Sequence, residues 1–361
     1  MKKLILLLLF IPLVSFGQLV ENTKDSINNE FSNLSDGPYI FINKDKLIKK
    51  TILKGKVSSK VLGINTYDTI YYPEKSTFNK IRKIAAFSDI HGQYDLAIQL
   101  LKNNKIIDKD LNWIFGKGHL VIVGDVFNRG NKVNEVLWLI YKLEIQAKSK
   151  GGRVHFLLGN HEYMIFHKDL RYINEKYNLS SRLLNLEYDE LYSDKTILGR
   201  WLRSKSTIIK INENVFTHGG VSEYFIGNGG SDFEEINTIM RKSINRTKQE
   251  MKSTDFYDIY YGPKSLIWYR GYFKKYGDDL TGNDISKILK LLDSKHIVVG
   301  HCSDNEVVQL FNNKIFGVDS SIKNGKYGEI LFIENKQFFF IKNKRFLRAS
   351  LNGELVEFKS K

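Results

Sequence analysis

Short apolar runs recur through the middle of the chain, each bounded by Gly, Asp or Asn. Runs of this kind predict strands that are buried on both faces. After the first two runs, apolar residues recur at the spacing of one helical face. The pattern therefore predicts an α/β fold in which strand, loop and helix alternate. The predicted strands are residues 84–87, 120–123, 154–158, 214–216 and 296–299, and the helical patterns begin at Tyr94 and Val133.

Residues that can bind metals follow each of these runs. The segments are SDIHGQ (88–93), GDVFNRG (124–130), GNHE (159–162), THGG (217–220) and VGHC (299–302). Carboxylates, an amide and imidazoles without a thiolate are typical of Zn, Mn or Fe sites, and not of Ca, Mg or thiolate-rich structural Zn sites. Because ligands gather at the carboxyl ends of sheet strands, we expect a two-metal site that hydrolyses a phosphate ester. The candidate ligands are Asp89, His91, Asp125, Asn160, His218 and His301.

Residues 1–17 have the pattern of a signal peptide. Lysines precede an apolar stretch over residues 4–13, and the small residues Ser15 and Gly17 favour cleavage before Gln18. The stretch is short for a membrane span, and a retained anchor is the alternative. We therefore expect a periplasmic or secreted protein with no stable membrane span after cleavage. Cys302 is the only cysteine, which excludes an intrachain disulfide and a lipid-modified cysteine after the signal.

The chain is basic, with 55 Lys and Arg residues against 40 Asp and Glu residues. Two of the basic residues, Lys2 and Lys3, lie in the predicted signal peptide. A basic surface favours anionic partners. The basic residues are spread along the chain without an arginine-rich stripe, which indicates a solvated basic surface. No nucleic-acid partner is expected.

Three segments surround the motifs within the mature chain. Residues 18–80 precede the motifs, and their alternating stretches predict a β-rich extension whose hairpin strands add to the edge of the core. Residues 163–206 separate two motifs and are expected to form a helical cap over the cleft. Residues 330–358 predict closing strands, so the catalytic domain is expected to span residues 81–361.

These motifs give the chain a clear family resemblance. Over residues 81–335, it resembles the calcineurin-like metallophosphoesterases and, among them, the phosphoprotein phosphatases. DLRYI (169–173) and LIWYRGY (266–272) are similar to the bacterial Shewanella-like subgroup. The resemblance implies a β-sandwich of two mixed sheets flanked by helices, with a dinuclear metal site at the strand ends.

The resemblance also implies how the ligands divide between the two metal ions. Asp89 and His91 would hold the first metal, and Asp125 would bridge both. A hydroxide between the metals, which would be Mn, Fe or Zn, would then attack phosphorus. The second metal would be held by Asn160, His218 and His301.

Four further residues have roles implied by the family. His161 matches the general acid, and Arg129 and Arg270 are candidates for gripping phosphate oxygens. Arg270 has a second interpretation, since it lies beside aromatic residues on which it could stack. Asn128 stands where relatives commonly have Asp, and an amide can orient the histidine but cannot stabilise its charged form. Glu162 is expected to accept hydrogen bonds that shape the site.

Other polar residues near the strands are interpreted as structural. Cys302 is predicted to be a small buried side chain, because no base is assigned to it. The remaining candidates, which we interpret as packed or solvated histidines, are His119, His155, His167 and His296.

Several functions are compatible with these motifs. We expect an exported phosphomonoesterase, foremost a protein phosphatase acting on phosphotyrosine or on phosphoserine and phosphothreonine, with small phosphate esters as further substrates. The alternative is a nucleotide or dinucleoside polyphosphate hydrolase. A nuclease or cyclic phosphodiesterase is disfavoured, because such relatives tend to carry histidine at the position of Ser303. A phosphate-binding protein that lost turnover through Asn128 is disfavoured by the complete ligand set.

Overall fold

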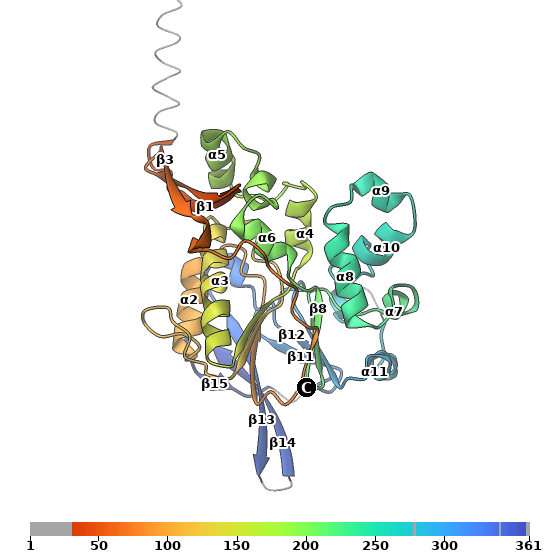
Figure 1. Cartoon of the computed structure of the whole chain (residues 1–361). Coiled ribbons are helices and arrows are strands. Elements are labelled where there is room, and N and C mark those ends of the chain that lie inside the picture. Colours follow the sequence, from red (N-terminus) through yellow and green to blue (C-terminus); the bar gives the residue numbers. More distant parts are fainter. Residues whose placement is uncertain (1–30, 277–278, 339–340, 359–361) are drawn as a thin grey trace, which may run out of the picture.

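The computed structural model describes residues 31–276, 279–338 and 341–358. Two stacked sheets form the centre, and helices cover both outer faces (Figure 1). The predicted signal peptide lies outside the described residues. Within the described part of the chain, no helix has the length and apolar composition needed to cross a membrane.

Both central sheets are mixed and have six strands, which confirms the predicted sandwich. The first sheet has the order β15 (Leu355–Val356), β14 (Ile341–Ser350), β13 (Glu329–Phe338), β5 (Lys83–Phe87), β6 (His119–Ile122) and β7 (Arg153–Phe156). The second has the order β11 (Val308–Leu310), β12 (Ile315–Gly317), β10 (His296–Val299), β9 (Asn214–Thr217), β8 (Ile208–Ile211) and β4 (Thr77–Phe78). All five predicted apolar runs are therefore strands.

Alternation along these strands explains why they are apolar on both faces. In β5, Ile84 and Ala86 belong to the layer between the two sheets, whereas Ala85 and Phe87 face the helices. In β10, Val298 lies in the same central layer while its neighbours face the opposite helices. A strand covered on both sides needs apolar residues at consecutive positions.

Helices complete the two outer layers. Those on the first sheet include α2 (Tyr94–Asn103) and α3 (Val133–Ser149), which begin at the predicted residues. Those on the second sheet include α7 (Glu223–Gly229), α8 (Phe233–Ser243), α9 (Lys248–Lys252), α10 (Phe256–Tyr261) and α11 (Gly282–Leu291). Residues 160–203 form α4 (Asn160–Phe166), α5 (Glu175–Leu184) and α6 (Ile197–Arg203). Short 3-10 turns are η1 (Ile64–Thr66), η2 (Tyr188–Tyr192), η3 (Lys274–Tyr276) and η4 (Ile322–Asn324).

The N-terminal strands do not extend the core as expected. β1 (Asp36–Asn43), β2 (Lys46–Leu53) and β3 (Lys56–Gly63) form a separate antiparallel sheet, and only the short β4 joins a core sheet, beside β8. The predicted hairpin strands are present as β1 and β2, but their expected place at the core's edge is wrong. The separate sheet instead packs on α3 and α6, where Tyr39 contacts the ring of Tyr192.

A buried carboxylate fastens this sheet to the insertion. Asp36 accepts hydrogen bonds of 2.6 Å from both the Tyr39 and the Ser180 hydroxyls, and the Lys176 ammonium lies 3.1 Å from its other oxygen. A buried charge is tolerated when it is paired and hydrogen-bonded in this way, and removing one partner of such a pair is costly. The N-terminal sheet and α5 are therefore held to each other by a specific polar cluster.

Two buried histidines lie between the sheets, as packed residues. His119 Nδ1 and His155 Nε2 are 2.9 Å apart, and the ring of Phe78 packs against both imidazoles. Burial, with Arg153 nearby, lowers the pKa of His119 to about 4. Burial and the neighbouring His119 hold the pKa of His155 well below its usual value. The folded protein therefore holds both rings neutral.

Replacing His119 and His155 together by Gln should flatten the pH dependence of the free energy of unfolding. Unfolded histidine titrates near about pH 6.5, so the unfolded wild type binds more protons as the pH falls from there toward 4. The wild type should lose up to about 1.4 kcal/mol per pH unit for each histidine in that window. Urea denaturation of both proteins, in chelator and at several pH values, measures the difference; parallel curves would contradict it.

Candidate metal centre

The predicted ligand loops meet at the carboxyl ends of β5, β6, β7, β9 and β10. All six predicted ligands are buried. Several site residues have a left-handed backbone, which non-glycine residues adopt at a cost that is commonly concentrated at functional sites. They are Asp89 (φ 54°), His91 (φ 44°), Asp125 (φ 58°), Asn128 (φ 71°), Arg129 (φ 66°) and His301 (φ 64°).

Glycines allow these loops to approach each other. A Cβ atom at Gly124, which has φ 87°, would lie 2.7 Å from Nδ1 of His218. A Cβ atom at Gly159 would overlap the carboxylate of Asp125. The glycines of the GD and GN motifs are therefore required by close packing of the ligands themselves.

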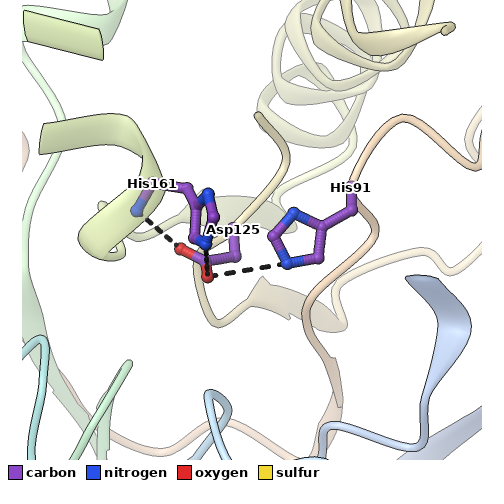
Figure 2. A group of neighbouring side chains, drawn as sticks. All are labelled: His91, Asp125 and His161. Carbon is purple, nitrogen blue, oxygen red and sulfur yellow. Dashed lines mark hydrogen bonds and ion pairs between the residues drawn. The ribbon is translucent and has the colours of Figure 1, made fainter. Parts of the chain in front are cut away.

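Asp125 lies at the centre of the cluster. Its Oδ2 atom is 3.1 Å from Nε2 of His218, 3.7 Å from Nε2 of His91 and 3.8 Å from Nε2 of His161. Figure 2 shows the imidazoles of His91 and His161 on two sides of this carboxylate. Two groups of donors, one with His91 and His161 and one with His218 and His301, both include Asp125. The geometry is that of a carboxylate shared by two neighbouring sites.

The hydrogen bonds of the imidazoles show which nitrogen faces the cluster. Nδ1 of His91 is 2.7 Å from the Phe127 carbonyl, and Nδ1 of His218 is 2.7 Å from the Val123 carbonyl. A carbonyl only accepts, so each Nδ1 carries a proton and a neutral ring presents its Nε2 lone pair to Asp125. Lone pairs that face a carboxylate repel it unless a cation lies between them. The residues present therefore fit a metal site.

The charge of the cluster supports the same conclusion. Burial alone would lower the pKa of His218, but the charge of Asp125 and a hydrogen bond to it outweigh burial and raise that pKa to about 10. The site thus attracts a positive charge strongly, and a metal ion would replace that proton. The imidazole of His301 has a buried Nε2 atom without a hydrogen-bond partner, as expected of a ligand atom.

Asp89 is oriented by its own hydrogen bonds. Its Oδ2 atom accepts from the Ser88 hydroxyl at 2.6 Å and from the backbone N–H of His301 at 2.9 Å. Its Oδ1 atom points to the cluster, 3.8 Å from Nε2 of His91. Burial and the nearby Asp319 raise the pKa of Asp89, so this end of the site also gains from a bound cation. Asp319 is a residue that the sequence did not single out.

Asn160 also points to the cluster. Its Oδ1 atom lies 2.9 Å from Nε2 of His218. Asn160 is the first residue of α4, directly after the carboxyl end of β7. The amide oxygen therefore lies beside His218 at the edge of the cluster.

Glu162 shapes the loop that carries Asp125. Its carboxylate accepts the backbone N–H groups of Asp125 (2.9 Å), Val126 (2.8 Å), Phe127 (3.2 Å) and Gly159 (2.7 Å). The structural role expected for Glu162 is therefore confirmed. The left-handed turn at Asp125 leaves the N–H groups of residues 125–127 without strand partners, and a carboxylate is a strong acceptor for them.

His161 and Asn128 form the predicted pair. The Asn128 side-chain nitrogen is 2.8 Å from Nδ1 of His161, while the backbone N–H of His161 donates to Asp125 Oδ1 at 3.0 Å. Burial lowers the pKa of His161 to about 4, and Asn128 supplies no charge to oppose this. The amide thus orients the ring without stabilising the imidazolium.

The two predicted arginines occupy different environments. The guanidinium of Arg129 lies 5.4 Å from the ring centre of Tyr172. Arg270 donates to the His301 carbonyl at 3.3 Å and packs on Tyr276, which lies 5.0 Å away, in place of the adjacent aromatic residues. Burial raises the pKa of the Cys302 thiol to about 11, in agreement with a structural role.

A cavity of about 630 Å³ opens beside the cluster. It is bounded by the first part of the insertion, by residues 248–264 and by the WYRGY segment. Asn160, His167, Arg171, Tyr257, Trp268 and Arg270 are among its lining residues. Of the insertion expected to cap the cleft, only residues between 163 and 171 line the cavity, and α5 and α6 pack against the N-terminal sheet.

The sequence did not identify every polar residue near the cluster. Tyr172 contacts His161, and its motif was noted only as a family feature. Lys323 donates to the Ser303 hydroxyl, which in turn donates to Asp319 at 2.6 Å. Lys323 and Asp319 belong to a segment without a metal-ligand motif, so only the folded chain brings them to the site.

The sequence of this chain is similar to those of known phosphoesterases. The family model for calcineurin-like phosphoesterases matches residues 82–307. The chain is 26% identical over 261 residues to Shewanella-like protein phosphatase 1 of Plasmodium berghei, which covers 71% of each chain. It is 24% identical over 295 residues to Shewanella-like protein phosphatase 2 of Arabidopsis thaliana, covering 70% of this chain and 74% of that protein.

The fold is also similar to that of a solved structure. The cold-active protein tyrosine phosphatase of a psychrophilic Shewanella species has a TM-score of 0.82 and 37% identity, and the match covers 89% of this chain and 98% of that chain. The ligand motifs, the mixed sandwich and the Asp125 cluster all lie within or beside the matched region. This chain belongs to the calcineurin-like phosphoesterase family and is a metal-dependent phosphoester hydrolase.

Proposed function

We propose that the protein is an exported phosphomonoesterase that removes phosphate from phosphoproteins. The observation that carries the proposal is the Asp125 carboxylate shared between two donor groups, with His161 and two arginines around it. The relatives named above are protein phosphatases, which supports a phosphorylated protein or peptide as substrate. Phosphotyrosine, phosphoserine and phosphothreonine are all candidate residues, and small phosphate esters would also enter the open cavity.

The residues of the chain have distinct parts in this reaction. Two ions of Mn, Fe or Zn, bridged by Asp125, would supply an activated hydroxide and offset charge on the phosphoryl group. Arg129 and Arg270 would bind phosphoryl oxygens, for which a planar guanidinium is well suited. His161 would protonate the leaving oxygen, with its ring oriented by Asn128.

The size of the cavity favours a polypeptide substrate. A space of about 630 Å³ is much larger than a phosphate group, and aromatic and basic side chains line it. Such walls can hold residues that flank a phosphorylated side chain. Tyr257 and Trp268 supply apolar surface there, and Lys248 and Lys264 supply positive charge.

Export is proposed from the N-terminal pattern. The short apolar stretch over residues 4–13 and the small residues Ser15 and Gly17 favour cleavage by a signal peptidase. The mature protein would then act in the periplasm or outside the cell.

Purified protein loaded with Mn, Zn or Fe should hydrolyse phosphopeptides. Phosphate release would be compared for phosphotyrosine and phosphoserine peptides, mononucleotides, a dinucleoside polyphosphate and a bis-phosphodiester. We expect the highest kcat/KM on phosphopeptides and the lowest on the diester. Preference for the nucleotides would favour the alternative hydrolase function, and turnover of none of these esters would contradict the proposal.

Single substitutions should separate the metal ligands from the general acid. Asp125→Ala should lose both metals and all turnover, and Asp89→Ala should lose one metal. His161→Asn should keep two metals but lose about 100- to 10,000-fold in turnover of a phosphoserine peptide, because the leaving oxygen no longer receives a proton.

The measurements are elemental analysis, phosphate release and circular dichroism as the control for folding. An aryl phosphate with an activated leaving group should be less sensitive to His161→Asn. Loss of a metal from His161→Asn would instead make His161 a ligand, as its place beside His91 allows.

Expression of the complete chain in a bacterial host with a periplasm should give a processed protein. Mass spectrometry of the periplasmic fraction should find an N-terminus at Gln18. Replacing Gly17 with Arg should block processing, because the peptidase requires a small residue there. An intact N-terminus in a membrane fraction would favour the retained anchor.

A further inference from the structure

The leaving group of the substrate must pass His161. In the proposed reaction this imidazole protonates the oxygen that departs, so the group attached to that oxygen lies next to the ring. The ring of Tyr172 is adjacent, with its centre 5.5 Å from the His161 ring centre. His161 is buried, whereas Tyr172 is 42% exposed. Tyr172 therefore offers an accessible aromatic surface where the leaving group emerges.

Tyr172 is held in place from several sides. Its carbonyl accepts the backbone N–H of Arg129 at 2.8 Å. The guanidinium groups of Arg129 and Arg171 lie 5.4 Å and 5.5 Å from its ring centre. Arg171 is in turn fixed by two hydrogen bonds of 2.7 Å to the Asp169 carboxylate. A ring oriented by these contacts loses little conformational freedom when it binds a ligand.

We propose that Tyr172 is a specificity-determining residue that packs against the aryl ring of a phosphotyrosine substrate. The proposal rests on the phosphomonoesterase function proposed above, and it assigns a preference for aryl over alkyl phosphomonoesters. Stacked or edge-on aromatic pairs are favourable beyond the area that they bury. The leaving oxygen of phosphoserine is attached to a single methylene group, which has no ring to place against Tyr172.

The neighbouring positive charges fit the same substrate. Arg129 reaches toward the phosphoryl group in the proposed reaction, and Arg171 lines the adjoining cavity. A phosphotyrosine would thus meet a cation at its phosphate, an aromatic ring at its own ring, and a second cation near its backbone. Cations beside an aromatic pair add attraction through the faces of the rings.

A purely positioning role for Tyr172 makes a different prediction. If its ring only held the Arg129 guanidinium, its loss would weaken the grip on phosphate for every monoester. The two roles therefore differ in whether the loss depends on the leaving group, and a matched pair of peptides can measure this.

The test uses the full mature protein, loaded with the metal that is most active, and one peptide sequence carrying either phosphotyrosine or phosphoserine. Tyr172→Ala should lower kcat/KM for the phosphotyrosine peptide by about threefold to tenfold, mainly through a higher KM, and should leave the phosphoserine peptide within about twofold. Tyr172→Phe should retain the wild-type preference. Tyr72→Ala is the matched control, because Tyr72 is an exposed tyrosine outside the site.

Equal losses on both peptides would overturn the proposal in favour of a positioning role. An unchanged preference in Tyr172→Ala would also overturn it. The same losses in Tyr172→Phe as in Tyr172→Ala would overturn it too, because the aromatic ring would then not be the feature that binds the substrate. Metal content and circular dichroism of each variant exclude a folding defect. Wild-type protein that hydrolyses neither peptide would overturn the proposed function, and this assignment with it, before any variant is compared.

Discussion

The buried carboxylate of Asp125 is the constraint on which the site depends. A buried charge is stable only when it is paired, and Asp125 is surrounded by the Nε2 atoms of three imidazoles at 3.1 to 3.8 Å. Two of these rings, His91 and His218, use Nδ1 for backbone carbonyls. In its neutral form each of these rings offers Asp125 only a lone pair, so a proton, as on His218, or a metal ion must lie between them. Cations resolve this conflict, so metal binding and the packing of the ligand loops stabilise each other.

Glu162 is a second buried carboxylate, and it accepts hydrogen bonds from backbone N–H groups in the loop that carries Asp125. The chain turns sharply at Asp125 and leaves its backbone N–H groups, and those of the next two residues, without partners in a strand. Glu162 accepts all three, together with the N–H of Gly159. Since α4 carries both Glu162 and His161, the same contact fixes His161 relative to Asp125.

The sequence predicted the parts of the molecule that local patterns determine. Strands such as β5, which is apolar from Ile84 to Phe87, carry apolar residues at consecutive positions because both faces are covered, and polar residues or glycines after such strands mark the loops. The position of the N-terminal sheet could not be predicted, because it depends on contacts with a distant segment, of Asp36 with Ser180 and of Tyr39 with Tyr192. For the same reason Tyr172 had no assigned role. Its position beside His161 arises from the fold of the insertion, and no sequence pattern near Tyr172 predicts that position.

The candidate metal ligands and most of the residues that would contact a substrate come from different segments of the chain. The candidate ligands come from loops at the ends of core strands. Hydrogen bonds to backbone groups hold these loops in one conformation. Tyr172 and most of the cavity lining come from segments outside those strands, although Asn160 also lines the cavity and Arg270 donates to the His301 carbonyl. Tyr172 reaches the centre through its ring contact with His161 and the hydrogen bond of its carbonyl to the Arg129 backbone N–H. Because that hydrogen bond belongs to the backbone and the Tyr172 side chain is uncharged, replacing this side chain leaves the bond and the charge balance at Asp125 in place.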